Sequence, residues 1–194
     1  YTRGEEFNRR FDDIINEAIQ LSIQGTREII LLGQNVNAYK SNDYDVNPVG
    51  LSDLIRYISH IDGIDRIRYT TSHPIDFSQD LISEYKNPKL ANNLHLPIQS
   101  GSDLILSKMK RKHTVLEYKS IIRKVREIRP DIHLSSDFIV GYPGESNYEF
   151  QKTLDFISEL NFSDAYSFIY SPRPGTPAAQ EFDDLSDKVK SDRL

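Results

Sequence analysis

The sequence contains no cysteine among its 194 residues. Disulfide bonds, zinc ribbons and iron–sulfur clusters held by thiolates are therefore excluded within these residues. Many cytosolic domains also lack cysteine, so its absence excludes kinds of site without pointing to one.

Long apolar runs are also lacking. No run approaches the roughly 18 residues that a membrane-spanning helix needs, and no basic-then-apolar leader opens the chain. With 38% hydrophobic and 27% charged residues, the composition is typical of one soluble globular domain with enough apolar residues for a core. We expect a cytoplasmic protein without a membrane partner.

A basic surplus is missing as well. The formal net charge of −5 argues against a dedicated nucleic-acid module, because neutralising several phosphates usually requires a basic face. A local exception follows the motif Gln99-Ser100-Gly101, and it contains Lys108, Lys110, Arg111, Lys112 and His113. This stretch fits either a solvated helix end or a phosphate-binding segment, and the sequence leaves both open.

Apolar residues at helical spacing alternate along the chain with short runs of Ile, Leu and Val. The spacing predicts helices at Phe11–Gln24, Leu51–Ile58, Leu81–Tyr85, Tyr118–Ile128 and Phe150–Leu160. The runs predict strands at Glu28–Leu32, Ile67–Thr71, Leu94–Ile98, Ile132–Val140 and Ala165–Tyr170. The pairs Thr114 with Glu117 and Ser146 with Glu149 match the capping box, so a helix should begin at each.

This alternation predicts an α/β fold with a parallel sheet, either open or curved toward a barrel. The chain begins with a helix and has no strand before it, so we expect the first strand of such a sheet to be missing. The segment Lys40–Pro48, rich in Asn and Asp, is predicted to be a loop.

A polar motif closes each predicted strand, beginning in its last residues or directly after it. These motifs are Gly33-Gln34-Asn35, Thr70-Thr71-Ser72-His73-Pro74, Gln99-Ser100-Gly101, Asp137 through Glu145, and Ser171-Pro172-Arg173-Pro174-Gly175-Thr176. Because the carboxyl ends of parallel strands meet at one edge, we expect the polar groups to gather where α/β enzymes keep their active sites.

Each motif also has a structural interpretation. The turn Gly141–Gly144 could present backbone N–H groups to an anion, yet it fits a tight strand-to-helix connection better. Asp137 fits a functional carboxylate or a structural hydrogen-bond acceptor equally well. Glu145 is favoured at a helix start by the dipole. The histidines lack metal-site spacing, so no metal site is predicted; His73 and His95 alone lie in strand-end motifs.

Read together, these motifs resemble the radical S-adenosylmethionine (SAM) methylthiotransferases. The resemblance covers essentially the whole chain and is specific because six motifs occur in the family's order. They are Tyr1-Thr2-Arg3-Gly4-Glu5-Glu6, Leu31 through Asn37, Thr70 through Pro74, His95 through Asp103, Ser136 through Glu145, and Tyr170 through Pro177.

The resemblance implies a partial (βα)6 TIM-like barrel of parallel strands with outer helices, its first strand missing. In that family the Tyr1–Glu6 segment directly follows a loop of three cysteines, which this chain does not contain. Residues 1–194 are thus expected to be an incomplete radical SAM core domain. The cysteine loop, the N-terminal methylthiotransferase domain and a C-terminal RNA-binding TRAM domain are expected to be absent from it.

The resemblance also implies cofactor-binding residues. Gln34 and Asn35 match positions at the methionyl amino end of SAM, and Gln99 and Ser100 match positions near its ribose and carboxylate. Asp137, Gly141 and Glu145 match the segment near the adenine, and Ser171 and Arg173 match the motif after the last strand. No catalytic side chain is assigned.

The implied reaction adds a methylthio group to C2 of N6-isopentenyladenosine beside the tRNA anticodon. It requires SAM and [4Fe-4S] clusters, whose ligands would lie outside this chain, so the chain alone is expected to be inactive. The resemblance makes tRNA a partner, with Lys108, Lys110, Arg111 and Lys112 as candidate contacts, together with reducing and sulfur-donor proteins.

Three alternatives stay open. The first alternative is the related enzyme that modifies a ribosomal protein, although the residues of the first three motifs favour tRNA. A non-enzymatic barrel that binds SAM or RNA is the second. The third is an ordinary barrel lyase, which is weakened by the lack of a Lys with a partner base among the strand-end motifs.

Overall fold

The structure is a computed structural model that describes residues 7–41, 48–70, 72–181 and 185–194. The chain divides into two compact units. The first comprises Tyr1–Asn92 with Glu127–Pro130, and the second Asn93–Arg126 with Asp131–Leu194. None of the helices within the described ranges is long and apolar enough to cross a membrane.

The first unit is built on two parallel strands, β1 (Glu28–Leu31) and β4 (Arg66–Tyr69), which pair from Glu28 opposite Arg66 to Leu31 opposite Tyr69. A short antiparallel pair joins β2 (Lys40–Ser41) to β3 (Val49–Gly50). The predicted Lys40–Pro48 loop is therefore wrong at its first two residues, because Lys40 pairs with Gly50 and Ser41 with Val49; residues 42–47 lie outside the described part.

Three helices accompany these strands, namely α1 (Phe11–Ile23), α2 (Leu51–Ser59) and α3 (Gln79–Glu84). Single turns of 3-10 helix follow β1 at Val36–Ala38 and β4 at Pro74–Asp76. Helix α2 buries one face through Leu51, Leu54, Ile55 and Ile58, which recur at helical spacing. The three helices predicted here from apolar spacing are thereby confirmed.

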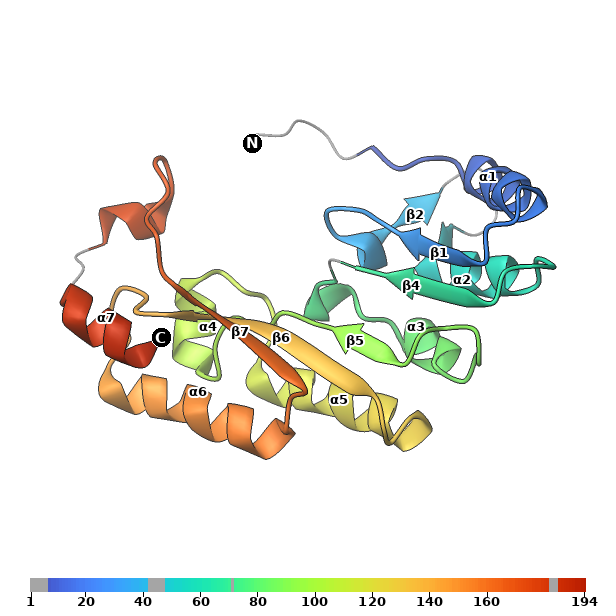
Figure 1. The fold of residues 1–194 in the computed structure, drawn as a ribbon. Helices are drawn as coiled ribbons and strands as arrows, with labels where there is room; N and C mark the ends of the chain where they lie inside the picture. The colour runs from blue at the N-terminus through green and yellow to red at the C-terminus, as the bar shows by residue number, and fades with distance from the viewer. Residues whose placement is uncertain (1–6, 42–47, 71, 182–184) are drawn as a thin grey trace. The chain divides into compact units, whose positions relative to one another are not determined.

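The second unit contains the parallel sheet β5 (Asn93–His95), β6 (His133–Val140) and β7 (Asp164–Ile169), in that order (Figure 1). Helices α5 (Val115–Ile128) and α6 (Asn147–Leu160) lie against one face of it. Tyr118 of α5, Phe156 of α6 and Phe138 of β6 pack edge to face there, with ring centroids 5.6 and 6.4 Å apart. This aromatic layer is the core of the unit.

Strand β6 alternates strictly between its two faces. Leu134, Ser136, Phe138 and Val140 are buried toward the helices, while Ser135, Asp137 and Ile139 are only half-buried. In the register of β6 with β7, Asp137 lies opposite Tyr166 and Ile139 opposite Phe168, so these four side chains share the face away from the helices. We call this surface the open face.

The structure also contains the helices α4 (Asp103–Lys108) and α7 (Asp187–Arg193), for which no range was predicted from the sequence, although a helix end near Lys108 was one of the two interpretations of the basic stretch. None of the three 3-10 turns in the described residues, the last at Pro177–Gln180, was predicted. Strand β5 is also shorter than the predicted Leu94–Ile98. Pro97 has no N–H to donate, and beyond it only Gln99 bridges to Phe138.

The α/β class with parallel strands is confirmed, since all five predicted strands form and all pair in parallel. Apart from the short antiparallel pair β2–β3, the described strands lie in two parallel sheets, one in each unit, and do not close a barrel. The predicted capping box at Thr114 is present in both directions, with the Glu117 backbone donating to Thr114 Oγ1 and the Thr114 backbone to Glu117 Oε2.

Candidate functional site

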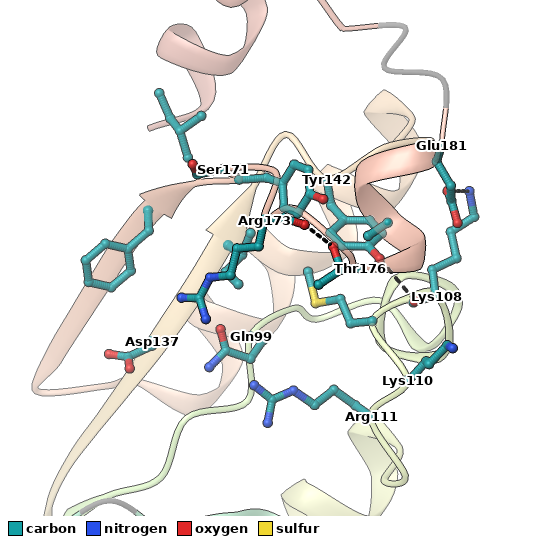
Figure 2. Close-up of a pocket in the computed structure, with 16 residues that line it drawn as sticks. Gln99, Lys108, Lys110, Arg111, Asp137, Tyr142, Ser171, Arg173, Thr176 and Glu181 are labelled. Carbon is teal, nitrogen blue, oxygen red and sulfur yellow. Dashed lines mark hydrogen bonds and ion pairs between the residues drawn. The ribbon is translucent and has the colours of Figure 1, made fainter. Parts of the chain in front are cut away.

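A cavity of about 670 Å³ lies in the second unit at the carboxyl end of β6 and β7 (Figure 2). That volume is typical of small-ligand sites. Polar side chains converge on it from the segments that follow three parallel strands. The polar and charged lining residues are Gln99, Lys108, Lys110, Arg111, Asp137, Tyr142, Tyr170, Ser171, Arg173, Thr176 and Glu181.

Gln99 is held in the cavity wall by its backbone. Its N–H donates to the Asp137 carbonyl and its carbonyl accepts from the Ile139 N–H, each at 2.9 Å. The residue has a φ of +83°, a conformation that costs a non-glycine residue about 1–3 kcal/mol. Figure 2 shows its side chain directed into the same open space as Arg111 and Arg173. The carboxamide can donate and accept without titrating, which suits a zwitterionic ligand.

The strand-to-helix turn after β6 borders the cavity through Tyr142. Gly141 has a φ of +70°, and a Cβ there would lie 2.7 Å from the Lys190 side chain, so glycine is required on both counts. The Gly141 N–H donates to Glu145 Oε2 at 2.8 Å. Burial raises the pKa of the Glu145 carboxyl, against the lowering effects of the Gly141 N–H and Arg193.

Lys108 ties helix α4 to this turn. Its Nζ donates to the Pro143 carbonyl at 3.3 Å and lies 3.7 Å from Glu181 Oε2. The Tyr142 hydroxyl donates to the Lys108 carbonyl at 3.1 Å, and the Tyr142 ring packs edge to face on Tyr170 at 4.9 Å. Burial raises the pKa of Tyr142, which keeps the hydroxyl a donor. Lys108 is therefore engaged within the protein.

The other three cations of the cavity lack an acidic partner among the described residues. Lys110, Arg111 and Arg173 line the wall, and within the described residues no acidic side chain pairs with them. Partial burial lowers the pKa of Arg111, because its charge is removed from water without a compensating anion. Three cations of this kind make the cavity suitable for an anionic ligand.

Next to the cavity, the open face carries a small polar cluster. His95 Nδ1 lies 2.9 Å from Ser135 Oγ, and its Nε2 lies 3.6 Å from Asp137 Oδ2. The ring of Tyr166 stands edge to face with the His95 ring at 6.3 Å. The imidazole is thus oriented by contacts on two neighbouring strands.

Other predicted site residues lie outside the cavity. Ser100 is fully buried and its hydroxyl lies 3.3 Å from Thr153 Oγ1 while accepting from the Ser102 N–H. Gly141 and Glu145 are buried in the turn behind Tyr142. Lys112 is exposed and is not part of the wall. Gln99, Asp137, Ser171 and Arg173 are the predicted cofactor residues that the cavity brings together.

Gln34 and Asn35 belong to the first unit, where they follow β1. Asn35 Nδ2 donates to Asp76 Oδ2 at 2.7 Å, while its Oδ1 is buried without a hydrogen-bond partner among the described residues. Asn37 exchanges two hydrogen bonds with the His73 backbone, at 2.8 and 2.9 Å. The loops after β1 and β4 are therefore fastened together. Gln34 is exposed.

Sequence reasoning did not select Tyr142, Tyr166, Phe168 or Tyr170. A pattern in the sequence could have identified three of them. Residues 166, 168 and 170 are spaced by two along β7 and its end, so their side chains lie on one face. Their contacts come from segments distant in sequence, such as Lys108, which no local pattern reveals. The segment Tyr1–Glu6 and Thr71 lie outside the described residues.

Residues 1–157 match the sequence profile of the Radical SAM superfamily, which is well over half of the chain. The chain belongs to the radical SAM superfamily. Curated relatives include a tRNA-2-methylthio-N(6)-dimethylallyladenosine synthase from Serratia proteamaculans and one from Photobacterium profundum, each 58% identical over 195 residues. The match covers 100% of this chain and 41% of each relative, so the chain spans about two fifths of their length.

Two solved structures share the radical SAM fold. Coproporphyrinogen III oxidase from Escherichia coli superposes with a TM-score of 0.65 at 18% identity, over 94% of this chain and 43% of its own. The radical SAM methyltransferase TsrM from Kitasatospora setae gives 0.67 at 16% identity, over 88% and 31%. These identities support the fold and nothing finer.

The side chains available as ligands decide which radical SAM cofactors the chain can hold. Without cysteine, its 194 residues offer no thiolate for a [4Fe-4S] cluster, and the described residues contain no group of three or more His, Asp or Glu that could hold a metal ion. The cluster therefore does not fit these residues. SAM does fit, because the cavity has a suitable volume, one arginine that can pair with the carboxylate of SAM, and the Gln99 carboxamide, which has no hydrogen-bond partner among the described residues.

Proposed function

We propose that this chain supplies the SAM-binding and substrate-binding core of a tRNA methylthiotransferase that forms 2-methylthio-N6-dimethylallyladenosine. The observation that carries the proposal is 58% identity, over the whole chain, to curated enzymes of that name. The finer fold, a partial (βα)6 barrel, and a cytoplasmic location beside tRNA belong to the same proposal.

SAM is proposed to bind in the cavity of the second unit. Arg173 would pair with its carboxylate, Gln99 would orient the amino acid or ribose hydroxyls, and Asp137 and Ser171 would accept or donate at the remaining polar edges. When bound, SAM supplies a methyl group and the adenosyl fragment. The protein's own part is to orient these groups and to exclude water, and no step here passes through an iron–sulfur cluster.

The other predicted cofactor residues keep a role in this proposal. Gln34 and Asn35 of the first unit are proposed as ligand contacts, and the buried Oδ1 of Asn35, which has no hydrogen-bond partner among the described residues, supports this for Asn35. Three others would act indirectly, by fixing the backbone around the cavity, namely Ser100, Gly141 and Glu145. Each already forms a hydrogen bond within the protein.

The basic stretch is proposed to contact tRNA phosphates. Lys110 and Arg111 are the stronger candidates because they lie at the cavity without acidic partners among the described residues. Lys112 is exposed next to them, whereas Lys108 is engaged with Pro143 and Glu181. Proteins that deliver electrons and sulfur are proposed as further partners.

A chimera tests this proposal directly. The chain replaces the matching 195-residue segment of the Serratia proteamaculans relative, and tRNA from cells lacking the native enzyme is digested and analysed by mass spectrometry for the methylthio nucleoside. Restored methylthiolation supports the proposal. Well-expressed chimera without product, beside an active parental enzyme, contradicts it.

Binding of SAM is tested separately by calorimetry on the chain itself. The variants Gln99→Ala and Arg173→Ala should each weaken binding, the first by roughly 2- to 13-fold, as expected for one neutral hydrogen bond worth about 0.5–1.5 kcal/mol. Lys188→Ala, an exposed position on α7, is the matched control. Equal affinity of all variants would place SAM elsewhere.

A further inference from the structure

The aromatic side chains of β7 carry an inference that rests on the proposed function and deepens it. Tyr166 and Phe168 are 50% and 54% exposed, although both are large and lie in the middle of a sheet strand. Single exposed apolar residues are ordinary, but two on successive same-face positions of one strand form a continuous surface. Tyr170, the next residue in this spacing, lines the cavity with Phe168.

The register places polar groups beside these rings. Tyr166 lies opposite Asp137 and Phe168 opposite Ile139, so the aromatic row runs along the edge of the open face and ends in the cavity. Neighbouring same-face residues are about 6.5–7 Å apart along a strand, a span comparable to that of a purine ring system and its substituent. His95 lies at the far end of the row. Its Nδ1 is bonded to Ser135 Oγ, and its Nε2 lies 3.6 Å from Asp137 Oδ2, beyond hydrogen-bond distance, so Nε2 can bond a base.

Tyr170 provides an independent sign of a ligand. Its hydroxyl is buried, yet it has no hydrogen-bond partner within the described part of the chain. A buried hydroxyl without a partner costs free energy, and a polar atom of a bound molecule would relieve that cost.

The charges of the cavity fit a nucleotide better than SAM alone. Within the described residues, Lys108 pairs with Glu181 and Asp137 lies next to His95, which leaves Lys110, Arg111 and Arg173 without acidic partners. SAM carries one carboxylate against a positive ammonium and a positive sulfonium centre, so it can neutralise at most one of these cations. Phosphates flanking a nucleobase would pair with the others.

From these observations we propose that Tyr166 and Phe168 form a stacking platform for the substrate adenine of tRNA, extruded from its loop. The base would lie on the two rings with its edge toward His95, while Lys110 and Arg111 hold the adjacent phosphates. Aromatic rings beside a cationic groove are how proteins bind single-stranded nucleic acid, because every base has a face that stacks.

The test measures RNA and SAM binding on the same variants of the full chain. The RNA probe is a fluorescently labelled anticodon stem-loop with N6-isopentenyladenosine, and binding is followed by anisotropy. Phe168→Leu and Tyr166→Leu keep apolar bulk and remove the aromatic face. Each should weaken RNA binding roughly 5- to 100-fold. The affinity for SAM, measured by calorimetry, should change less than twofold in Tyr166→Leu, because Tyr166 is not part of the cavity wall, whereas Phe168 is.

Two further variants make the result specific. Phe168→Tyr keeps the ring and should restore RNA binding to within about threefold. Tyr148→Ala removes a still more exposed aromatic side chain from helix α6 of the same unit, and it should leave RNA binding unchanged. Thermal melting of every variant shows whether the fold is retained.

The outcomes separate this inference from the proposed function. Unchanged RNA binding in both leucine variants, or no RNA binding by the unsubstituted chain, overturns the platform. Loss of SAM binding in Tyr166→Leu overturns it too, because the face would then belong to the cofactor. An active chimera combined with any of these results leaves the proposed function intact, whereas an inactive chimera contradicts that function whatever the aromatic variants do.

Discussion

Arg193 and Glu145 form a buried ion pair between the helix α7 and the turn that borders the cavity. Arg193 Nη1 donates to Glu145 Oε2 and to the Glu145 carbonyl, each at 2.8 Å, and the two side chains are 5% and 1% exposed. The guanidinium also lies 5.1 Å from the centre of the Phe150 ring. Because Glu145 Oε2 accepts from the Gly141 N–H as well, α7 fixes the conformation of this turn.

Replacing Arg193 should therefore lower the stability of the protein. In Arg193→Ala the Glu145 carboxylate is left buried without its cation, and we expect the free energy of unfolding to fall by about 3–5 kcal/mol. Urea denaturation measures this change. Lys188→Ala on the same helix should cost less than about 0.5 kcal/mol, since its side chain is exposed. A loss below 1 kcal/mol in Arg193→Ala would mean that the pair does not stabilise the native state.

Gln99 offers a test that separates stability from binding. Its φ of +83° is unfavourable for every residue except glycine, so Gln99→Gly should be about 0.5–1 kcal/mol more stable than Gln99→Ala despite the larger entropy of glycine in the unfolded chain. Both variants lack the carboxamide and should bind SAM equally weakly. If Gln99→Ala is the more stable of the two in urea denaturation, residue 99 does not hold this conformation in solution.

The strands and part of the candidate site could be predicted from the sequence. Leu134, Ser136, Phe138 and Val140 alternate with less apolar positions, so the periodicity of β6 reveals both a strand and its two faces. Gln99 and Asp137 could be predicted as neighbours because Gln99 follows β5, Asp137 lies in the carboxyl-terminal half of β6, and parallel strands end at one edge.

The remaining features depend on contacts that no local pattern contains. Ser100 follows Gln99 directly, yet its hydroxyl meets Thr153 of α6 and is not part of the cavity wall. Glu149 matched a capping box with Ser146, yet its carboxylate accepts from Ser102, 47 residues away, and only the Glu149 backbone donates to Ser146. The predicted hydrogen bond from the Ser146 backbone N–H to the Glu149 carboxylate is therefore wrong, because the carboxylate accepts from the buried Ser102 hydroxyl instead.

Gly101 marks the place where the loop after β5 meets helix α6. A Cβ at this position would lie 2.7 Å from Thr153 Cα and 2.8 Å from the Lys152 carbonyl, which are backbone atoms that cannot move independently of the helix. Gly101→Ala should lower the free energy of unfolding by about 1–3 kcal/mol through this overpacking. It should also weaken SAM binding, since Gln99 lies two residues away. A melting temperature equal to that of the unsubstituted chain would show that the loop can move away from α6 without cost.

The contact of Ser102 with Glu149 predicts a specific pH dependence. The Ser102 hydroxyl, with a smaller contribution from Lys152, lowers the pKa of the Glu149 carboxyl, and burial opposes this effect. A carboxyl whose pKa is lower in the folded state stabilises the protein above its unfolded pKa, about 4.3, and this contribution is lost as the pH falls through the folded pKa. The stability difference between the unsubstituted chain and Glu149→Gln should thus be constant above about pH 5 and shrink below about pH 4.

The control for this dependence is Ser146→Ala. Ser146 caps α6 by accepting from the Glu149 backbone N–H, so its loss should cost about 0.5–2 kcal/mol at every pH, because no titrating group is removed. Ser102→Ala removes a similar cap from α4 and, in addition, the donor to the carboxylate. Its cost should therefore be larger at pH 7 than at pH 3.5 by an amount that Ser146→Ala does not show. Parallel pH profiles for the two serine variants would contradict a charge-assisted hydrogen bond between Ser102 and Glu149.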